Sequence, residues 1–358
     1  MQPLARLSMP ERVAAHLREG IGEGRWSGTL PGVARLAVDL DVSRHTVRRA
    51  LQLLEAEGLL GRRGLCRSRG ITAQVLSGHP LRVGILGHSG LLDMQLKTAQ
   101  MLALIQQQLV GAGHEVFVTP KSQSDLKHDL RRIVNHLHAH PADAWIVISG
   151  SHPLLEWCAG QTLPYLALYG RSGELALARS GPEKAPAYIA ATRQLIELGH
   201  RRIVLIARHA RRHPTPGSVE RAFLAELGAH GITTGSYHLP DWEETPAGLA
   251  SLLENLFHHS PPTALIIDET AYYVAAAEFL ARRGIRVPLH VSLVSTDDDT
   301  SLAWCLPGIA HIKWDHAPIV RRVVRWIAAV RRGKQDHKTL NFPAVFVPGG
   351  SIGPVWKG

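Results

Sequence analysis

The sequence contains few cysteines and no long apolar run. Its 358 residues include three cysteines, Cys66, Cys158 and Cys305, which are odd in number and too far apart for a CxxC pair. This pattern predicts no disulfide framework and favours a reducing compartment. Residues 1–20 carry a charge every few positions, and no stretch of about 18 uncharged apolar residues occurs anywhere. We therefore expect neither export nor a membrane span, and a cytoplasmic location.

Motifs for nucleotide, metal and nucleophilic chemistry are also missing. Neither GxGxxG nor GxxxxGK[ST] occurs. The run His136-x-His138-x-His140 has no carboxylate or cysteine that would complete a metal site. The segment Gly87-His88-Ser89-Gly90 begins like a nucleophile elbow, but its fifth residue is Leu91 instead of glycine. We therefore predict no catalytic residues, no metal and no cofactor, and a protein that is not an enzyme.

The composition is typical of a globular chain with more than one domain. Apolar residues make up 45% and charged residues 20% of the chain, close to globular averages. At roughly 150 residues per domain, the length predicts two to three folding units. Forty Lys and Arg against thirty Asp and Glu give a net charge of +10, which suits a polyanionic partner.

Many of the basic residues gather in an N-terminal module. Ser8 and Glu11 have the spacing of a capping box ahead of apolar residues at helical intervals, which predicts a helix over 9–22. A second short apolar stripe follows, and Ser43 can cap a third helix of about 44–57. Residues 59–72 are typical of two short strands that turn at Gly64.

The segment from Ser43 to Arg69 carries seven arginines and two glutamates, a net charge of +5. A helix with basic and hydrogen-bonding residues on its first turns can enter the major groove, and a hairpin edged by arginines can reach phosphates or a minor groove. The alternative is a solvated basic face. The residues that we expect to contact DNA are Ser43, Arg44, His45, Thr46, Arg48, Arg62, Arg63 and Gly64.

This module resembles the GntR winged helix over residues 8–72. The resemblance rests on Leu30-Pro31, Leu36-Ala37, Val42-Ser43-Arg44, Thr46-Val47-Arg48, Ala50-Leu51, Leu53-Leu54-Glu55 and Glu57-Gly58-Leu59. Gly32 and Ala34 replace the family's usual serine and DNA-contacting arginine, so Arg35 is the expected substitute, and Cys66 stands where a second wing glycine is common. The resemblance implies an α+β winged helix-turn-helix domain over 1–72 that binds double-stranded operator DNA.

The remainder of the chain has the pattern of an α/β protein. Residues 73–80 fall in a stretch of Gly, Ser and Pro that predicts a linker. Beyond it, short apolar runs alternate with helical segments of about 12 to 20 residues. The runs are 82–86, 115–118, 144–148, 203–206, 264–267 and 291–294. This alternation predicts parallel sheets covered by helices, in two lobes with a ligand cleft at the strand carboxyl ends.

Residues 81–358 resemble the effector domain of the lactose-repressor (LacI) family, which is itself similar to periplasmic sugar-binding proteins. The resemblance rests on the segments 195–203, 220–223, 288–298 and 307–312. It implies a two-lobed α/β domain of the periplasmic-binding-protein-like type I fold. Lobe 1 is expected over about 81–172 and 301–335, and lobe 2 over about 173–300 and 336–358.

The resemblance also implies effector-binding residues. Arg221 matches an arginine that holds ligand hydroxyls and Asp297 the carboxylate opposite it, a donor and acceptor pair that suits vicinal diols. Trp242 and Trp314 match pocket side chains whose rings complement sugar C–H surfaces, and Asp268 matches an aspartate at a strand end. An interlobe salt bridge for Arg221 with Asp297, and a core position for each Trp, are the alternatives.

Three further residues follow predicted strands and are expected to face the cleft: His88, Ser89 and Tyr169. Taken together, the sequence predicts a homodimeric, ligand-responsive transcription regulator, with a sugar as effector. Repression of carbohydrate-utilisation genes, relieved by the ligand, is the expected mode. A regulator with a vestigial pocket that senses a protein, and a cytosolic sugar-binding protein or enzyme with a basic extension, remain as alternatives.

Overall fold

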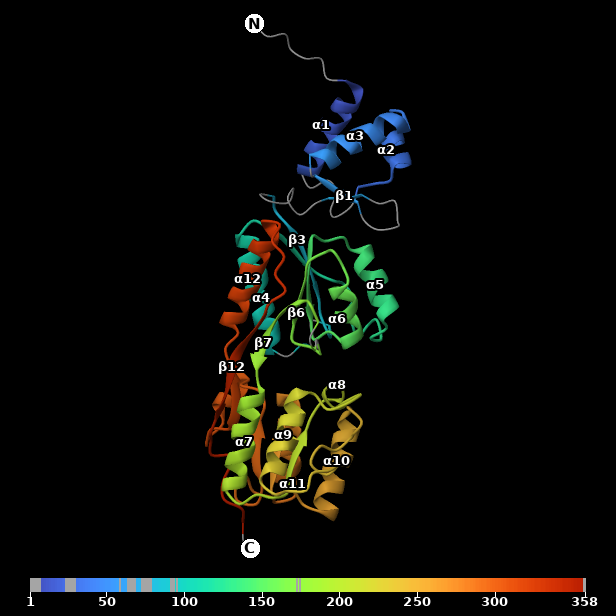
Figure 1. Cartoon of the computed structure of the whole chain (residues 1–358). Coiled ribbons are helices and arrows are strands. Elements are labelled where there is room, and N and C mark those ends of the chain that lie inside the picture. Colours follow the sequence, from blue (N-terminus) through green and yellow to red (C-terminus); the bar gives the residue numbers. More distant parts are fainter. Residues whose placement is uncertain are drawn as a thin grey trace. The chain divides into compact units, whose positions relative to one another are not determined.

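The computed structural model describes residues 8–22, 30–57, 59–62, 69–71, 79–90, 94, 96–171, 173 and 175–356 (Figure 1). The chain divides into two compact units. The first comprises residues 1–94, 98–180 and 317–340, and the second comprises residues 95–97, 181–316 and 341–358. None of the described helices combines the length and the apolar character needed to cross a bilayer.

The described part of the N-terminal domain has three helices and two short antiparallel strands. Its elements are α1 (Met9–Gly22), α2 (Val33–Asp39), α3 (Arg44–Ala56), β1 (Leu60–Arg62) and β2 (Arg69–Ile71). The predicted first helix is confirmed, and the Ser8 backbone N–H donates to Glu11 Oε2 at 2.7 Å as the capping-box spacing requires. The strands pair antiparallel, with Leu60 opposite Ile71.

One apolar core holds these helices together. It is built from residues at helical spacing on all three helices, together with Leu30 and Leu60: Val13, Ala14, Leu17, Ile21, Leu36, Ala37, Val47, Ala50, Leu51 and Leu54. Arg18 on α1 also makes a two-pronged ion pair with Glu57 at the end of α3, with Nη2 2.6 Å from Oε1. Because the apolar side chains face inward, the basic side chains of α3 are left on its outer face.

The first unit contains a parallel sheet in the order β4-β3-β5-β6-β7. Its strands are β3 (Arg82–Leu86), β4 (Glu115–Val118), β5 (Ala144–Ile148), β6 (Tyr165–Leu168) and β7 (Ala178–Glu183). The helices α5 (Leu130–Ala139) and α6 (His152–Ala159) pack on one face, around Trp145. The helices α4 (Leu96–Gly111) and α12 (Ala317–Arg331) lie on the other (Figure 1). Gly84 lacks a side chain at the point where the Trp145 ring crosses it.

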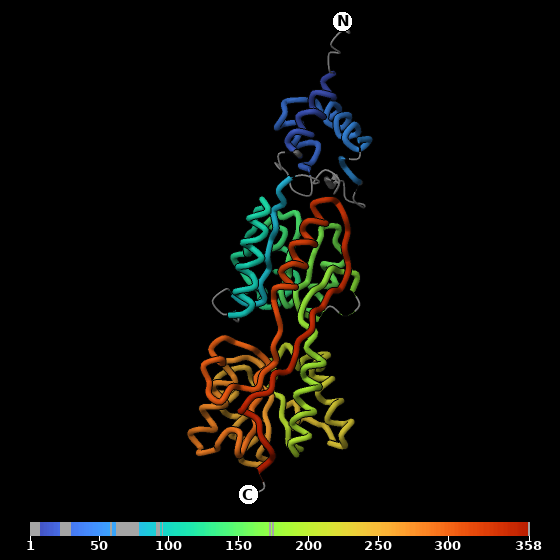
Figure 2. Tube along the Cα trace, turned by 90° about the vertical axis from the view of Figure 1, so that its left-hand side faces the viewer, coloured from blue at the N-terminus to red at the C-terminus, as the bar shows by residue number. Residues whose placement is uncertain are grey.

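The second unit repeats this plan. Its strands are β8 (Ile203–Ile206), β9 (Ala264–Ile267), β10 (Ser292–Ser295), β11 (Ala310–Trp314) and β12 (Thr339–Val347). Strands β8 to β11 are parallel, in the order β11-β10-β9-β8. Strand β12 runs antiparallel to β11, so the C-terminal segment, red in Figure 2, returns along it. The covering helices are α7 (Ala185–Glu197), α8 (His209–Arg212), α9 (Ser218–Ala229), α10 (Pro246–His259) and α11 (Thr270–Arg282).

The boundaries of the units differ from the predicted lobes chiefly in one segment, with smaller differences at residues 173–180 and 336–340, which belong to the first unit. Residues 301–335 were expected in the first lobe, but residues 301–316 belong to the second unit. The reason is strand pairing, because β11 hydrogen-bonds to β10 on one side and to β12 on the other. The 3₁₀ helix η2 (Thr300–Trp304) that precedes it therefore also belongs to the second unit.

Candidate functional site

Helix α3 presents a basic outer face, which is the candidate DNA surface. The Thr46 backbone N–H donates to Ser43 Oγ at 3.1 Å, so Ser43 caps the helix as predicted. Arg44, His45 and Arg48 are exposed, on the side opposite the core residues. A capped helix with cationic side chains on its first turns can offer donors to phosphates and base edges.

The other predicted DNA-contacting residues have varied positions. Arg35 is exposed on α2, with its Nε 3.9 Å from Asp39 Oδ2. Thr46 is half-buried, and its Oγ1 lies 2.8 Å from Ser43 Oγ, so it takes part in the cap. Arg62 lies in β1, where only its backbone is described, and Arg63 and Gly64 lie outside the described residues.

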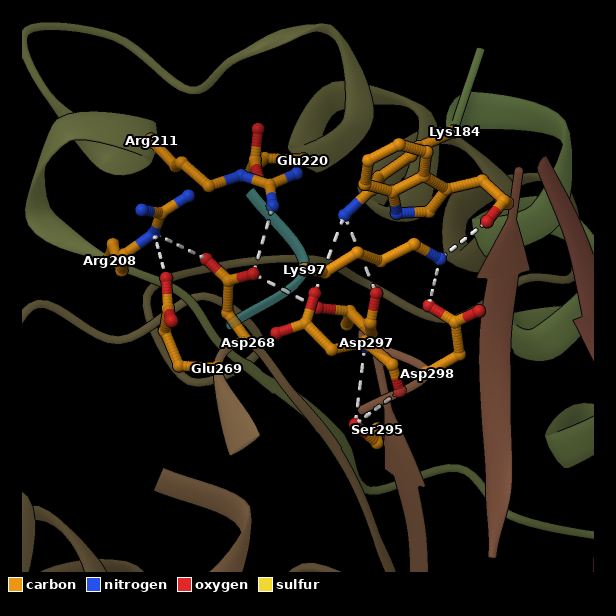
Figure 3. Close-up of polar contacts among 12 residues, drawn as sticks. Lys97, Lys184, Arg208, Arg211, Glu220, Asp268, Glu269, Ser295, Asp297 and Asp298 are labelled. Carbon is orange, nitrogen blue, oxygen red and sulfur yellow. Dashed lines mark hydrogen bonds and ion pairs between the residues drawn. The ribbon is translucent and has the colours of Figure 1, made fainter. Parts of the chain in front are cut away.

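A second candidate site lies at the edge of the second sheet where its parallel strands end. Carboxyl ends of parallel strands meet at one edge, so the residues that follow them are brought together. Here the charged residues that follow β8, β9 and β10 lie close together (Figure 3). Trp314 at the end of β11 joins them through Lys97. We call this set the strand-end cluster: Lys97, Lys184, Arg208, Arg211, Glu220, Asp268, Glu269, Asp297, Asp298 and Trp314.

Asp268 is the centre of the cluster, with only 1% of its surface exposed. Its Oδ2 lies 3.1 Å from Arg208 Nε and its Oδ1 lies 3.0 Å from Arg211 Nη1. The Thr296 hydroxyl donates to Oδ1 at 2.9 Å. Burial alone disfavours the charge, but Arg211 and Arg208 outweigh it and hold the pKa of Asp268 well below its ordinary value. Asp268 is therefore ionised and rigidly held.

Two glutamates extend this network. Glu220 on α9 forms an ion pair with Arg211, whose Nε lies 2.7 Å from Glu220 Oε1. Glu269 forms one with Arg208, whose Nε lies 2.8 Å from Glu269 Oε1. Glu269 has a backbone φ of +64°, which is unusual for a residue with a side chain. Such strained residues concentrate at binding and catalytic sites, where the surrounding contacts hold them in place.

The two aspartates after β10 face lysines. Asp297 Oδ1 lies 3.8 Å from Lys184 Nζ, and burial raises the pKa of Asp297 while that lysine opposes the rise. Asp298 accepts a hydrogen bond from Lys97, which also donates to the Trp314 carbonyl oxygen. The Lys97 ammonium lies 4.2 Å from the centroid of the Trp314 ring. The cluster therefore offers carboxylates, ammonium groups and an aromatic face within one small region.

Three of the predicted effector residues belong to the cluster: Asp268, Asp297 and Trp314. Arg221 does not. It is exposed on α9, and its Nη1 donates to the Pro216 carbonyl oxygen at 2.6 Å. The structure does not bring Arg221 to Asp297, because the side chain on α9 that contacts the cluster is that of the neighbouring Glu220.

Trp242 is a core residue. It is buried in the apolar cluster formed by α10, α11 and the sheet, with its ring edge-on to Tyr272 at 5.2 Å. Its Nε1 donates to the Ala207 carbonyl oxygen at 3.1 Å. The core alternative therefore describes Trp242 better than the stacking role, since the indole N–H already has an internal partner.

The remaining predicted residues lie in the first unit, after β3 and β6. His88 and Ser89 follow β3 and are half-buried. Tyr169 follows β6 with a backbone φ of +63°, and its hydroxyl donates to Met101 Sδ at 3.2 Å. Burial raises the pKa of Tyr169, so the phenol remains protonated.

Four basic residues of the cluster are not among those predicted from the sequence: Lys97, Lys184, Arg208 and Arg211. The strand-end rule could have identified Arg208, which lies two residues after β8. Lys97 gave no such signal, because it contacts a residue 217 positions away.

Comparison with known proteins assigns both domains. Residues 10–65 match the family described as bacterial regulatory proteins, gntR family. Residues 192–352 match the periplasmic binding protein-like domain. The second match covers β8 to β11 and hence most of the strand-end cluster.

Two curated proteins are distant relatives. HTH-type transcriptional regulator AscG of Escherichia coli (strain K12) is 25% identical over 137 residues, which cover 37% of this chain and 40% of AscG. HTH-type transcriptional regulator AglR of Rhizobium meliloti (strain 1021) is 24% identical over 221 residues, which cover 58% of each chain. In both cases the match spans less than two thirds of the relative.

Solved structures share the fold of the larger domain. A LacI-family transcriptional regulator from Enterococcus faecium with bound ribose superposes with a TM-score of 0.60 at 16% identity, over 76% of this chain and 99% of that one. The lac repressor dimer bound to operator and an anti-inducer gives a TM-score of 0.63 at 19% identity, over 78% and 97% of the two chains. The chain thus joins a gntR-family helix-turn-helix domain to a periplasmic-binding-protein-like domain with the fold of LacI-family regulators.

Proposed function

We propose that this protein is a transcription regulator that binds operator DNA through its N-terminal domain and a sugar through its second domain. The observation that carries the proposal is the presence, in one chain, of a gntR-type domain with a basic outer face on α3 and a periplasmic-binding-protein-like domain with a polar strand-end cluster. We propose repression of carbohydrate-utilisation genes in the cytoplasm, relieved by the ligand.

At the DNA end, α3 enters the major groove with its capped N-terminus foremost. Arg44, His45 and Arg48 are exposed there and carry donors for phosphates and base edges. The wing arginines Arg62 and Arg63 add phosphate contacts. The net charge of +5 between Ser43 and Arg69 supplies the electrostatic part of the affinity.

At the effector end, the strand-end cluster binds hydroxyl groups. Carboxylates accept hydrogen bonds from hydroxyls and ammonium groups donate to them, so Asp297 and Lys184 together can fix adjacent hydroxyls. The Trp314 ring supplies an apolar face for sugar C–H groups. Asp268 and its two arginines act as the rigid support beneath.

The two ends are coupled through a homodimer. Two copies place two recognition helices on symmetric half-sites, and the lac repressor with the same fold is a dimer on its operator. Trp304, the last residue of η2, and Leu306, just after it, are 89% and 96% exposed to water, and we propose that the second copy covers these apolar side chains. If sugar and operator favour different dimer arrangements, each weakens the other by about 1–3 kcal/mol.

The test begins with DNA selected from a random pool by the purified protein. The double variant Arg44→Ala with Arg48→Ala should lose affinity for the selected sequence, while Arg12→Ala, an exposed arginine on α1, serves as the matched control. If the double variant and the control bind the selected DNA with equal affinity, α3 is not the helix that recognises the DNA sequence. Sugar binding that leaves the protein–DNA complex unaffected favours a plain sugar-binding protein, and a regulator that ignores every sugar favours a protein-sensing pocket.

A further inference from the structure

Lys97 fills a small cage in the strand-end cluster that has the features of an ammonium site. Its Nζ donates to the Asp298 carboxylate and to the Trp314 carbonyl oxygen, and it lies 4.2 Å from the centroid of the Trp314 ring. A carboxylate, a carbonyl oxygen and an indole face together match the three donors and the charge of a primary ammonium. The Lys97 side chain is only 18% exposed.

Such a cage is selective for charge. Burial lowers the pKa of Lys97, and the hydrogen bond that Lys97 donates to Asp298 partly restores it. An ammonium that has left water is stable only where acceptors replace its hydration. A neutral hydroxyl can satisfy the same acceptors, but it gains neither the full ion pair nor the attraction of the ring.

The charges of the whole cluster favour the same kind of ligand. Four basic side chains face five carboxylates when Lys97 is in place. Without Lys97, three basic side chains remain for the same five carboxylates. A ligand with one positive charge would therefore restore the balance that Lys97 provides, whereas an anionic ligand would meet net repulsion.

We propose that the effector is an amino sugar whose protonated amine displaces the Lys97 ammonium from the cage of Asp298 and Trp314. The inference rests on the proposed function, since it names the class of sugar for the same site. Lys97 acts as an internal competitor that occupies the cage in the absence of ligand. The sugar hydroxyls then meet Asp297 and Lys184.

The test uses matched ligands in isothermal titration calorimetry, below the pKa of the sugar amines. The probes are D-glucosamine, D-galactosamine and D-mannosamine, each beside its N-acetyl form and its parent hexose. We expect at least one amine to bind the full-length protein more tightly than both of its neutral partners. If Lys97 occupies the cage nine-tenths of the time, Lys97→Ala should bind that amine about tenfold more tightly. Lys97→Met, which keeps an apolar side chain of similar length but no ammonium, should tighten amine binding in the same way.

The control is Lys313→Ala, which removes an exposed ammonium from the same strand as Trp314 and should leave the affinity unchanged. Asp298→Asn should abolish the preference for the amine. A neutral hexose or N-acetyl sugar that binds as well as its amine and releases operator overturns the inference but leaves the proposed function intact. A lack of binding by all nine sugars, to wild type and to Lys97→Ala alike, overturns the inference, whereas the proposed function is rejected only if no sugar of any other class alters operator binding either.

Discussion

The buried carboxylate of Asp268 offers the sharpest test of the strand-end cluster. Asp268→Asn keeps the size of the side chain but removes the charge shared by Arg208, Arg211 and Thr296. Loss of one partner from a buried ion pair costs about 3–5 kcal/mol. Arg211 retains Glu220 at 2.7 Å and Arg208 is partly exposed, so the lower end, about 3 kcal/mol, is expected.

Thermal unfolding followed by circular dichroism measures this change. For a domain of this size about 3 kcal/mol corresponds to a Tm lowered by roughly 6–12 °C. The matched control is Glu278→Gln, which breaks an exposed pair with Arg282 on α11 and should cost less than about 1 kcal/mol. A Tm loss in Asp268→Asn no larger than that in the control refutes the central role of Asp268.

The pH dependence gives a second check on the same variant. The folded-state pKa of Asp268 lies below its ordinary value, so its ionised form stabilises the fold at every pH above the unfolded pKa near 4. This contribution is lost as the pH falls from about 4 through the folded-state pKa. The Tm difference between wild type and Asp268→Asn should therefore be constant above about pH 5 and shrink below about pH 4. A difference that grows on acidification contradicts the assignment.

Three further predictions concern the N-terminal domain and the dimer. Ser43→Ala removes the cap of α3 and should lower the unfolding free energy of the N-terminal domain by about 1 kcal/mol in denaturant titrations; an unchanged midpoint rejects the cap. Replacing Arg62 and Arg63 with Ala should flatten the slope of log K against log salt by up to about one per lost phosphate contact, and a loss confined to the specific operator rejects phosphate anchoring. Trp304→Ser with Leu306→Ser should shift the protein toward the monomer in sedimentation, and an unaltered dimer places the interface elsewhere.

Local patterns in the sequence predicted the N-terminal domain well. Helix α1 begins and ends where the capping box and the apolar spacing placed it, and Ser43 caps α3 as expected. These features depend on residues three or four positions apart, so they can be read from the chain directly. The alternation of apolar runs with helical segments likewise predicted the parallel sheets.

The candidate effector site was predicted only in part, and the reason is physical. Asp268 and Asp297 follow strands, so the topology alone brings them together. The structure does not bring Arg221 to the cluster, because adjacent residues of a helix point in different directions. Glu220 is the residue on α9 that turns toward it. Lys97 reaches the cluster from a remote part of the chain, and no local pattern reports such a contact.

The proposed regulator links sugar binding to operator binding, and this linkage can be measured directly. Operator affinity is determined by fluorescence anisotropy with and without a saturating sugar, and the affinity for that sugar is determined with and without operator. If the two sites are linked, both affinities change by the same factor, between about 5-fold and 150-fold. A sugar that binds the second domain tightly and changes operator affinity by no measurable factor would contradict it.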